Sequence, residues 1–184
     1  IDGDINGNGI GDSSVFRIEA LAGEVISVNI NGFTIQNGKS TDGGGVFASA
    51  RQTGSVILNL VGNIIRNNES TNSGAGIGVY AEDSGSNAQA TLTNNVIDNN
   101  HTTANGAGVY GFSNLSANTT LLLINNSISG NTADLVGGGL RAYASNAATT
   151  SATVKNNIIW GNSAGSGDDI AVRKSLNGSA NVSA

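Results

Sequence analysis

The first residues of the chain have the types and the spacing of a calcium-binding loop. Asp2, Asp4 and Asn6 alternate with other residues and precede Gly7, as the oxygen ligands do in the first half of an EF-hand loop. Carboxylate and amide oxygens of this kind bind Ca²⁺. The sequence therefore suggests calcium as the one candidate cofactor, with these candidate ligands: Asp2, Asp4, Asn6, Asn8 and Asp12.

The second half of this loop departs from the pattern. The bidentate acid that closes an EF-hand loop is replaced by Ser13, and Asp12 stands one residue early. Asp12 still offers a ligand for a shortened loop. The alternative is an Asp-, Asn- and Gly-rich turn that binds no metal. The sequence leaves both interpretations open.

No set of residues in the sequence predicts catalysis. Hydrolysis of a glycosidic bond needs a pair of carboxylates that converge on one surface, whereas the acids after residue 12 are scattered along the chain. His101 is the only histidine, and no serine or cysteine nucleophile motif accompanies it. We therefore expect that the chain is not an enzyme.

Composition narrows the choice of partners. The chain of 184 residues contains 27 Gly and no Pro, Cys or Met, and its formal net charge is −5. Without cysteine there is no disulfide and no thiolate metal site. The sequence lacks the basic patch of a nucleic-acid-binding protein, and no apolar run reaches the roughly 18 residues of a membrane-spanning helix. We expect neither nucleic-acid binding nor membrane insertion.

The residues named above lie on a repeating sequence, whose fold determines their positions. Residues 156–162 read Asn-Asn-Ile-Ile-Trp-Gly-Asn, and related segments precede them four times. A near-constant period of this size is typical of a repeat protein. The central isoleucines are separated by 30, 32, 31 and 31 residues and are these: Ile35, Ile65, Ile97, Ile128 and Ile159.

Each repeat is predicted to hold three short strands. An alternating strand precedes the Asn-rich segment, and another strand follows a run of glycines such as residues 137–139. Coils that stack about 4.8 Å apart place like residues above one another, so that Val, Ile and Leu fill a narrow core and Asn side chains form ladders. The alternating strands are expected to point these residues inward: Val28, Ile30, Leu58, Leu60, Ala90, Leu92, Leu121, Leu123, Ala152 and Val154.

The motif Asn-Asn-x-Ile-x-x-Asn, followed by Gly-Gly-Gly and a hydrophobic residue, resembles a known family. It is similar to the right-handed parallel β-helix repeats of bacterial surface and secreted proteins, including polymorphic outer-membrane-protein-like domains. The opening run 1–12 and the ending 157–162 with Asp169 and Ile170 share this resemblance. The resemblance implies an all-β, right-handed, single-stranded parallel β-helix of about five to six coils, each of roughly 31 residues with three strands.

The repeats predict one domain and a short end segment. Residues 1–173 are expected to form the β-helix, with an incomplete first coil at 1–27 and five repeats at 28–173. Residues 174–184 fall outside the pattern, and we expect a tail, a linker or a strand that packs elsewhere.

One outer face is predicted to collect aromatic and arginine side chains. If Val46, Ile77 and Val109 point inward, the residues after them point outward. Such a face, when open, commonly forms a binding surface. The alternative is that loops between coils cover the face and make a second small core. The candidate binding or assembly face contains Phe47, Tyr80, Tyr110, Phe112, Arg141 and Tyr143.

The pattern favours a role outside the cell. We expect a non-enzymatic extracellular or cell-surface module, structural or adhesive, that self-associates into filaments or binds a cell-surface partner or a polysaccharide. The unpaired strand edges at the ends of a β-helix invite pairing, so either the native protein continues there or subunits stack end to end into a filament. The alternative is a carbohydrate-active enzyme or a carbohydrate-binding β-helix. Sequons in a predicted loop make Asn114 and Asn118 candidate glycosylation sites.

Overall fold

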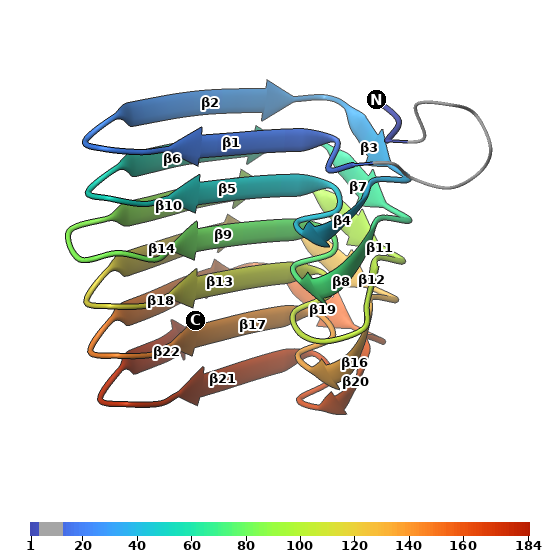
Figure 1. Ribbon diagram of the computed structural model, residues 1–184. Coiled ribbons are helices and arrows are strands. Elements are labelled where there is room, and N and C mark those ends of the chain that lie inside the picture. Colours follow the sequence, from blue (N-terminus) through green and yellow to red (C-terminus); the bar gives the residue numbers. More distant parts are fainter. Residues whose placement is uncertain (4–12) are drawn as a thin grey trace.

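The chain forms a stack of parallel β-coils. The computed structural model describes residues 1–3 and 13–184, and in these ranges it contains 22 strands and no helix. The coils lie one above another along a single axis, with the N-terminal coil at one end of the stack and the C-terminal coil at the other (Figure 1). The structure confirms an all-β fold of parallel stacked coils of about 31 residues.

Four parallel sheets run along the stack, and each is named here after its first strand. The β1 sheet contains β1 (Phe16–Ala20), β5 (Val46–Ala50), β9 (Ile77–Ala81), β13 (Val109–Ser113), β17 (Leu140–Ala144) and β21 (Ile170–Lys174). The β2 sheet contains β2 (Val25–Asn31), β6 (Ser55–Val61), β10 (Asn87–Thr93), β14 (Asn118–Ile124), β18 (Thr149–Lys155) and β22 (Ser179–Ser183).

The other two sheets are built from shorter strands. The β3 sheet contains β3 (Thr34–Gln36), β7 (Ile64–Arg66), β11 (Val96–Asp98), β15 (Ser127–Ser129) and β19 (Ile158–Trp160). The β4 sheet contains β4 (Lys39–Asp42), β8 (Glu69–Ser73), β12 (His101–Thr102), β16 (Thr132–Val136) and β20 (Ser163–Ser166). This β4 sheet gives a complete coil four strands where the sequence analysis counted three. Its strands are short and polar, so they lack the alternating apolar signal that identifies a strand.

The corners of the coil explain the abundance of Asn and Gly. A left-handed backbone conformation stands at each corner between the β2 and β3 sheets, because only Gly and, less readily, Asn adopt it at low cost. The residues at this corner have φ from 53° to 74° and are Gly32, Gly62, Asn94, Asn125 and Asn156.

The core lies inside the coil and consists of aligned apolar columns. In the β3 sheet the predicted isoleucine column is confirmed, since Ile35, Ile65, Ile97 and Ile128 are each 0% exposed and pair in register. The predicted inward residues of the β2 sheet also belong to this core, with only the end positions Val28 and Val154 partly exposed.

Two buried asparagine ladders run beside the apolar core. Their side chains pass a hydrogen bond from Nδ2 to the Oδ1 of the next coil over 2.9–3.0 Å. Each Oδ1 that accepts this bond also accepts the backbone N–H of the asparagine one coil earlier, and each Nδ2 that donates it also donates to a backbone carbonyl. The predicted Asn ladder is therefore confirmed, in two copies: Asn63, Asn95, Asn126 and Asn157, and Asn68, Asn100, Asn131 and Asn162.

The end of the β-helix lies beyond the boundary predicted at residue 173. Residues 174–184 are not a tail outside the fold, because β22 pairs in parallel with β18 over five residues. The sequence did not reveal this strand because residues 174–184 contain no Asn-Asn-x-Ile segment, the motif that identified the other repeats. In the ranges that the structure describes, no helix is long and apolar enough to cross a membrane.

Candidate functional site

The outer face of the β1 sheet carries two columns of side chains. Strand register places the residues of one column directly above one another, as the sequence pattern predicted. The first column contains Arg17, Phe47, Gly78, Tyr110, Arg141 and Ala171. The second column contains Glu19, Ser49, Tyr80, Phe112, Tyr143 and Arg173.

The aromatic side chains of these columns form a second apolar cluster, separate from the core inside the coil. Phe47, Tyr80 and Tyr110 are only 2%, 5% and 5% exposed, and Phe112 and Tyr143 pack against them. The expectation of an open aromatic face is therefore corrected, and the alternative of a covered satellite core applies to its larger part. The partly exposed members, Phe112 and Tyr143, lie at one end of the cluster.

The rings contact one another along the stack. Ring centroids are 5.2 Å apart for Phe47 and Tyr80, 5.7 Å for Tyr80 and Phe112, and 5.6 Å for Phe112 and Tyr143. Gly78 makes room for this packing, because a Cβ built on it would lie 2.7 Å from the ring of Tyr80. The glycine in the column is therefore a packing requirement of the cluster.

Tyr80 ties the aromatic cluster to the β4 sheet. Its hydroxyl donates to Oδ1 of Asp42 at 2.9 Å, and Asn72 donates to the same oxygen at 2.9 Å. Burial raises the pKa of Tyr80 well above its usual value, and the negative charge of Asp42 raises this pKa further. Burial likewise raises the pKa of Tyr110. Both hydroxyls therefore stay protonated at physiological pH.

Arg141 stands at the end of the cluster formed by Tyr110 and Tyr143, and its guanidinium has no hydrogen-bond acceptor among the described residues. The residue is 5% exposed, and its Nε and Nη1 are buried without a hydrogen-bond partner among the described residues. Its guanidinium carbon lies 5.2 Å from the ring centre of Tyr110 and 5.0 Å from that of Tyr143. Burial lowers the pKa of Arg141, with a smaller lowering from Arg173 and opposite contributions from the tyrosines. An arginine nevertheless keeps its charge at neutral pH.

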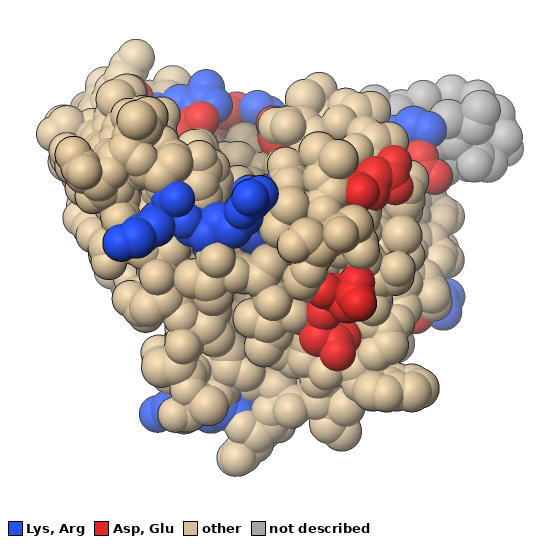
Figure 2. Space-filling view, turned by 90° about the horizontal axis from the view of Figure 1, so that it is seen from below, with Lys and Arg blue, Asp and Glu red and all other residues tan. Residues whose placement is uncertain are grey.

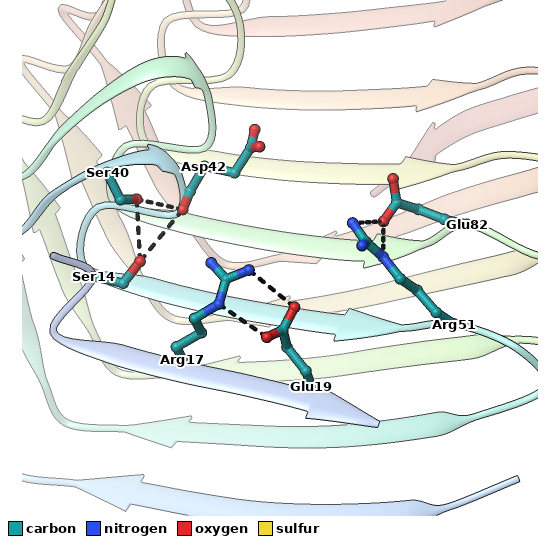
Figure 3. Close-up of polar contacts among 7 residues, drawn as sticks. All are labelled: Ser14, Arg17, Glu19, Ser40, Asp42, Arg51 and Glu82. Carbon is teal, nitrogen blue, oxygen red and sulfur yellow. Dashed lines mark hydrogen bonds and ion pairs between the residues drawn. The ribbon is translucent and has the colours of Figure 1, made fainter. Parts of the chain in front are cut away.

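Two other arginines near this face have carboxylate partners. Figure 3 shows Arg17 paired with Glu19 on β1, and Arg51, directly after β5, paired with Glu82, directly after β9. Arg17 also lies over the ring of Phe47, at 4.4 Å from its centre. Arg141 has the same kind of ring contact without the acid. The position two residues after it, where Arg17 has Glu19, is occupied by Tyr143.

Two clefts meet at Arg141 and Tyr143, which line both. One, of about 210 Å³, extends over the aromatic cluster to Asp42 and Asn72. The other, of about 320 Å³, is lined in addition by Arg173, Lys174 and Ser175. Figure 2 views this end of the stack from below and shows basic side chains gathered together on the surface, apart from the acidic ones. The surroundings of Arg141 are thus aromatic on one side and cationic on the other.

The predicted calcium ligands lie mostly where the structure gives no description. Asp4, Asn6, Asn8 and Asp12 fall outside the described residues. The carboxylate of Asp2 accepts hydrogen bonds from the side-chain amides of Gln36 and Asn37, at 3.1 and 3.0 Å. Within residues 1–3 and 13–184, no group of three His, Cys, Asp or Glu side chains is placed to hold a metal ion. Calcium binding by the loop stays a prediction.

The remaining candidate residues lie on the surface. Asn114 is half-buried and its Oδ1 accepts a hydrogen bond from Asn146 at 2.7 Å, whereas Asn118 is exposed at the start of β14. Glycosylation of either residue stays a prediction. His101 is partly exposed, and its Nε2 lies 3.2 Å from Oδ1 of Asp134. This is a surface pair of the kind that contributes little to stability.

Comparison of the chain with protein-family models, with curated proteins and with solved structures finds no match. The site is therefore interpreted from its own geometry.

The sequence analysis placed the aromatic face correctly but missed three of its features. It did not connect Asp42 with Tyr80, which are 38 residues apart. It did not distinguish Arg141 from Arg17, although the contrast of Arg-x-Glu at 17–19 with Arg-x-Tyr at 141–143 is visible in the sequence. It also left out Lys174, because that residue fell beyond the predicted boundary.

Proposed function

We propose that this chain is a non-enzymatic β-helix module with a structural or adhesive role at the cell surface or outside the cell. In this role its coils stack end to end on the coils of a second copy. One observation carries the proposal: the apolar core opens at the last coil. Ile170 and Val172 of β21 are 41% and 44% exposed, whereas Leu140 and Ala142, their register partners in β17, are 0% exposed.

The opposite end of the stack offers a complementary surface. Ile26 and Val28 of β2 belong to inward columns but are partly exposed. Strands β2 and β22 are the two outer strands of the same sheet, so each presents backbone donors and acceptors on its free side. The two surfaces differ, so their contact is heterologous and extends without closing, which favours a filament.

The arrangement of the described residues favours a rod-like module over an enzyme. Most of the described residues form repeated columns, ladders and corners, and their carboxylates make separate contacts, such as Glu69 with Lys39 at 2.7 Å and Asp42 with Tyr80 at 2.9 Å. Location outside the cell is supported by the resemblance of the Asn-Asn-x-Ile-x-x-Asn motif to surface β-helix repeats.

Sedimentation velocity over a range of protein concentrations tests the proposal. We expect species larger than a monomer that grow with concentration. Val172→Asp, at the open end of the core, should abolish this growth, because a charge at the contact would have to lose its hydration. Val96→Asp is the matched control, since Val96 is 40% exposed on the side of the stack. A monomer at every concentration, with unchanged circular dichroism, would overturn the proposal.

A further inference from the structure

We propose that the clefts at Arg141 and Tyr143 bind an acidic sugar, with the guanidinium of Arg141 receiving the sugar carboxylate. This site lies on the side of the stack and goes beyond the end-to-end association proposed above. It is assigned by the buried, unpartnered guanidinium, by its aromatic walls and by the basic residues beside it.

The guanidinium is the centre of the proposed site. A buried charged group without an acceptor is unfavourable, and nearly all such groups in proteins have a partner. A planar guanidinium matches the geometry of a carboxylate, to which it donates two parallel hydrogen bonds. Tyr143 is the more exposed of the two rings against Arg141. Its hydroxyl forms a hydrogen bond with the hydroxyl of Ser175 at 2.8 Å. Rotation of the Tyr143 side chain, which breaks this hydrogen bond, is therefore the movement that admits a carboxylate.

The charge around the site favours an anion. Arg173 and Lys174 line the same cleft as Arg141, and none of the three forms an ion pair within the described residues. Tyr110 and Tyr143 flank the guanidinium. The two acids that line the adjoining cleft already have partners, since Asp42 accepts a hydrogen bond from Tyr80 and Glu82 pairs with Arg51. Three cations without a carboxylate partner raise the local concentration of a negatively charged ligand.

The rest of the cleft favours a sugar over an acidic peptide. A pyranose ring offers an apolar face to an aromatic wall and a rim of hydroxyls to polar groups. Phe112 and Tyr143 provide partly exposed rings, stacked at 5.6 Å between centroids. The rim combines acceptors and donors that suit hydroxyl groups, from Asp42, Asn72, Ser73 and Asn105.

Nuclear magnetic resonance titration of the full chain tests the site with three matched probes: galacturonic acid, galactose and acetate. We expect galacturonic acid to shift the Nε–H signal of Arg141 and the ring signals of Phe112 and Tyr143. Galactose lacks the carboxylate and acetate lacks the ring, so each should bind at least about tenfold more weakly. A short peptide with two glutamates serves as the probe for the competing class of partner.

Substitutions at two positions separate recognition from folding. Arg141→Gln should weaken galacturonic acid binding by about tenfold or more, whereas Arg66→Gln, on the outer side of the β3 sheet, should not. Tyr143→Glu gives Arg141 the internal carboxylate that Glu19 gives Arg17, and should abolish binding. Tyr143→Gln removes the same ring without adding a carboxylate and should retain weakened binding. This second pair decides the question if Arg141→Gln does not fold.

Four outcomes would overturn the assignment. Equal binding of galactose would remove the role of the carboxylate, and equal binding of acetate would remove the role of the sugar. Stronger binding of the glutamate peptide would assign the cleft to an acidic protein partner. Unchanged signals with all probes would leave no site. None of these results depends on sedimentation, so failure of this inference and failure of end-to-end stacking are distinguishable.

Discussion

The two faces of strand β13 are both buried, but for different reasons. Val109 points into the coil and is 0% exposed, and its neighbour Tyr110 points outward and is 5% exposed. Val109 stands in a uniform column with Ile77 and Leu140. Tyr110 stands in a mixed column, between Gly78 and Arg141. Burial alone therefore does not distinguish the core of the fold from a covered outer cluster.

The chemistry of a column makes the distinction. Every coil must fill the same inner space, so inner positions hold apolar or small side chains, and a small residue such as Gly111 makes room for a large neighbour, Leu121. The outer face carries no such requirement, and there Arg, Phe, Gly, Tyr and Ala succeed one another. We infer that the inner column maintains the fold and that the outer column is free to hold a site. Substitutions on the inner face should consequently reduce stability strongly, whereas those on the outer face should change stability less and should act mainly on the site.

The largest effect is expected for an inner charge. Val109→Asp buries a carboxylate with no partner, at a cost of several kcal/mol against a total stability of about 5–15 kcal/mol. We expect the domain to unfold, as seen by loss of the β-sheet circular dichroism signal. Thr120→Asp, at an exposed position of β14, is the control and should leave the signal intact. A folded Val109→Asp protein with an unchanged melting temperature would contradict the assigned inner face.

A smaller effect is expected for a break in an asparagine ladder. Asn131→Ala removes the acceptor for the backbone N–H and the Nδ2 of Asn100, at 3.1 and 2.9 Å. These buried donors lose their partner, so we expect a loss of about 2–4 kcal/mol in the free energy of unfolding. Urea denaturation provides the measurement. Asn118→Ala, at an exposed site, should change it by less than about 0.5 kcal/mol, and an equal loss in both variants would argue against the ladder.

The inner face could be predicted from the sequence, and for a physical reason. Stacking repeats the same environment every 30 to 32 residues. The same residue type, apolar or Asn, therefore recurs at equivalent positions of several repeats, and a chance match of this kind is improbable. The isoleucine column, the inward positions of the β2 sheet and the Asn ladders were all predicted in this way. The fourth strand of the coil was not predicted because β12 is only two residues long and the other strands of the β4 sheet are short and polar.

The outer site could be predicted only in part. Strand alternation placed Phe47, Tyr110 and Arg141 on one face, but alternation does not tell whether that face is covered. Its burial depends on ring packing between coils and on the hydrogen bond from Tyr80 to Asp42. The hydrogen bond occurs once, and the ring contacts are confined to the coils from Phe47 to Tyr143. A feature that occurs once gives no periodic signal, so the sequence analysis left the open and the covered face as alternatives.

The burial of Tyr110 in the outer cluster should be detectable in the pH dependence of the free energy of unfolding. The pKa of buried Tyr110 is raised from a usual value of about 10, so the unfolded chain loses this proton first as pH rises. The stability contributed by the neutral hydroxyl is fully present below about pH 10 and is lost above it, at up to about 1.4 kcal/mol per pH unit. Tyr110→Phe should therefore reduce the slope of stability against pH between 10 and 11, measured by urea denaturation. An unchanged slope in Tyr110→Phe would contradict the burial of this hydroxyl.

The smallest effect is expected where the outer face already has its ion pair. Glu19→Gln removes the carboxylate that lies 2.9 Å from Arg17, and the two side chains are 34% and 51% exposed. An exposed pair of this kind contributes about 0–1 kcal/mol, so the melting temperature should hardly change.

The same variant makes Arg17 resemble Arg141, since each then lies over an aromatic ring without an acid beside it. Arg17 remains exposed to water, however, and a hydrated guanidinium gains little from a carboxylate. We therefore expect Glu19→Gln to create no detectable binding of galacturonic acid in the titration that reports on Arg141. Binding at Arg17 as strong as at Arg141 would show that an unpaired arginine over a ring is sufficient. Burial would then have no part in the difference between the two ends of the cluster.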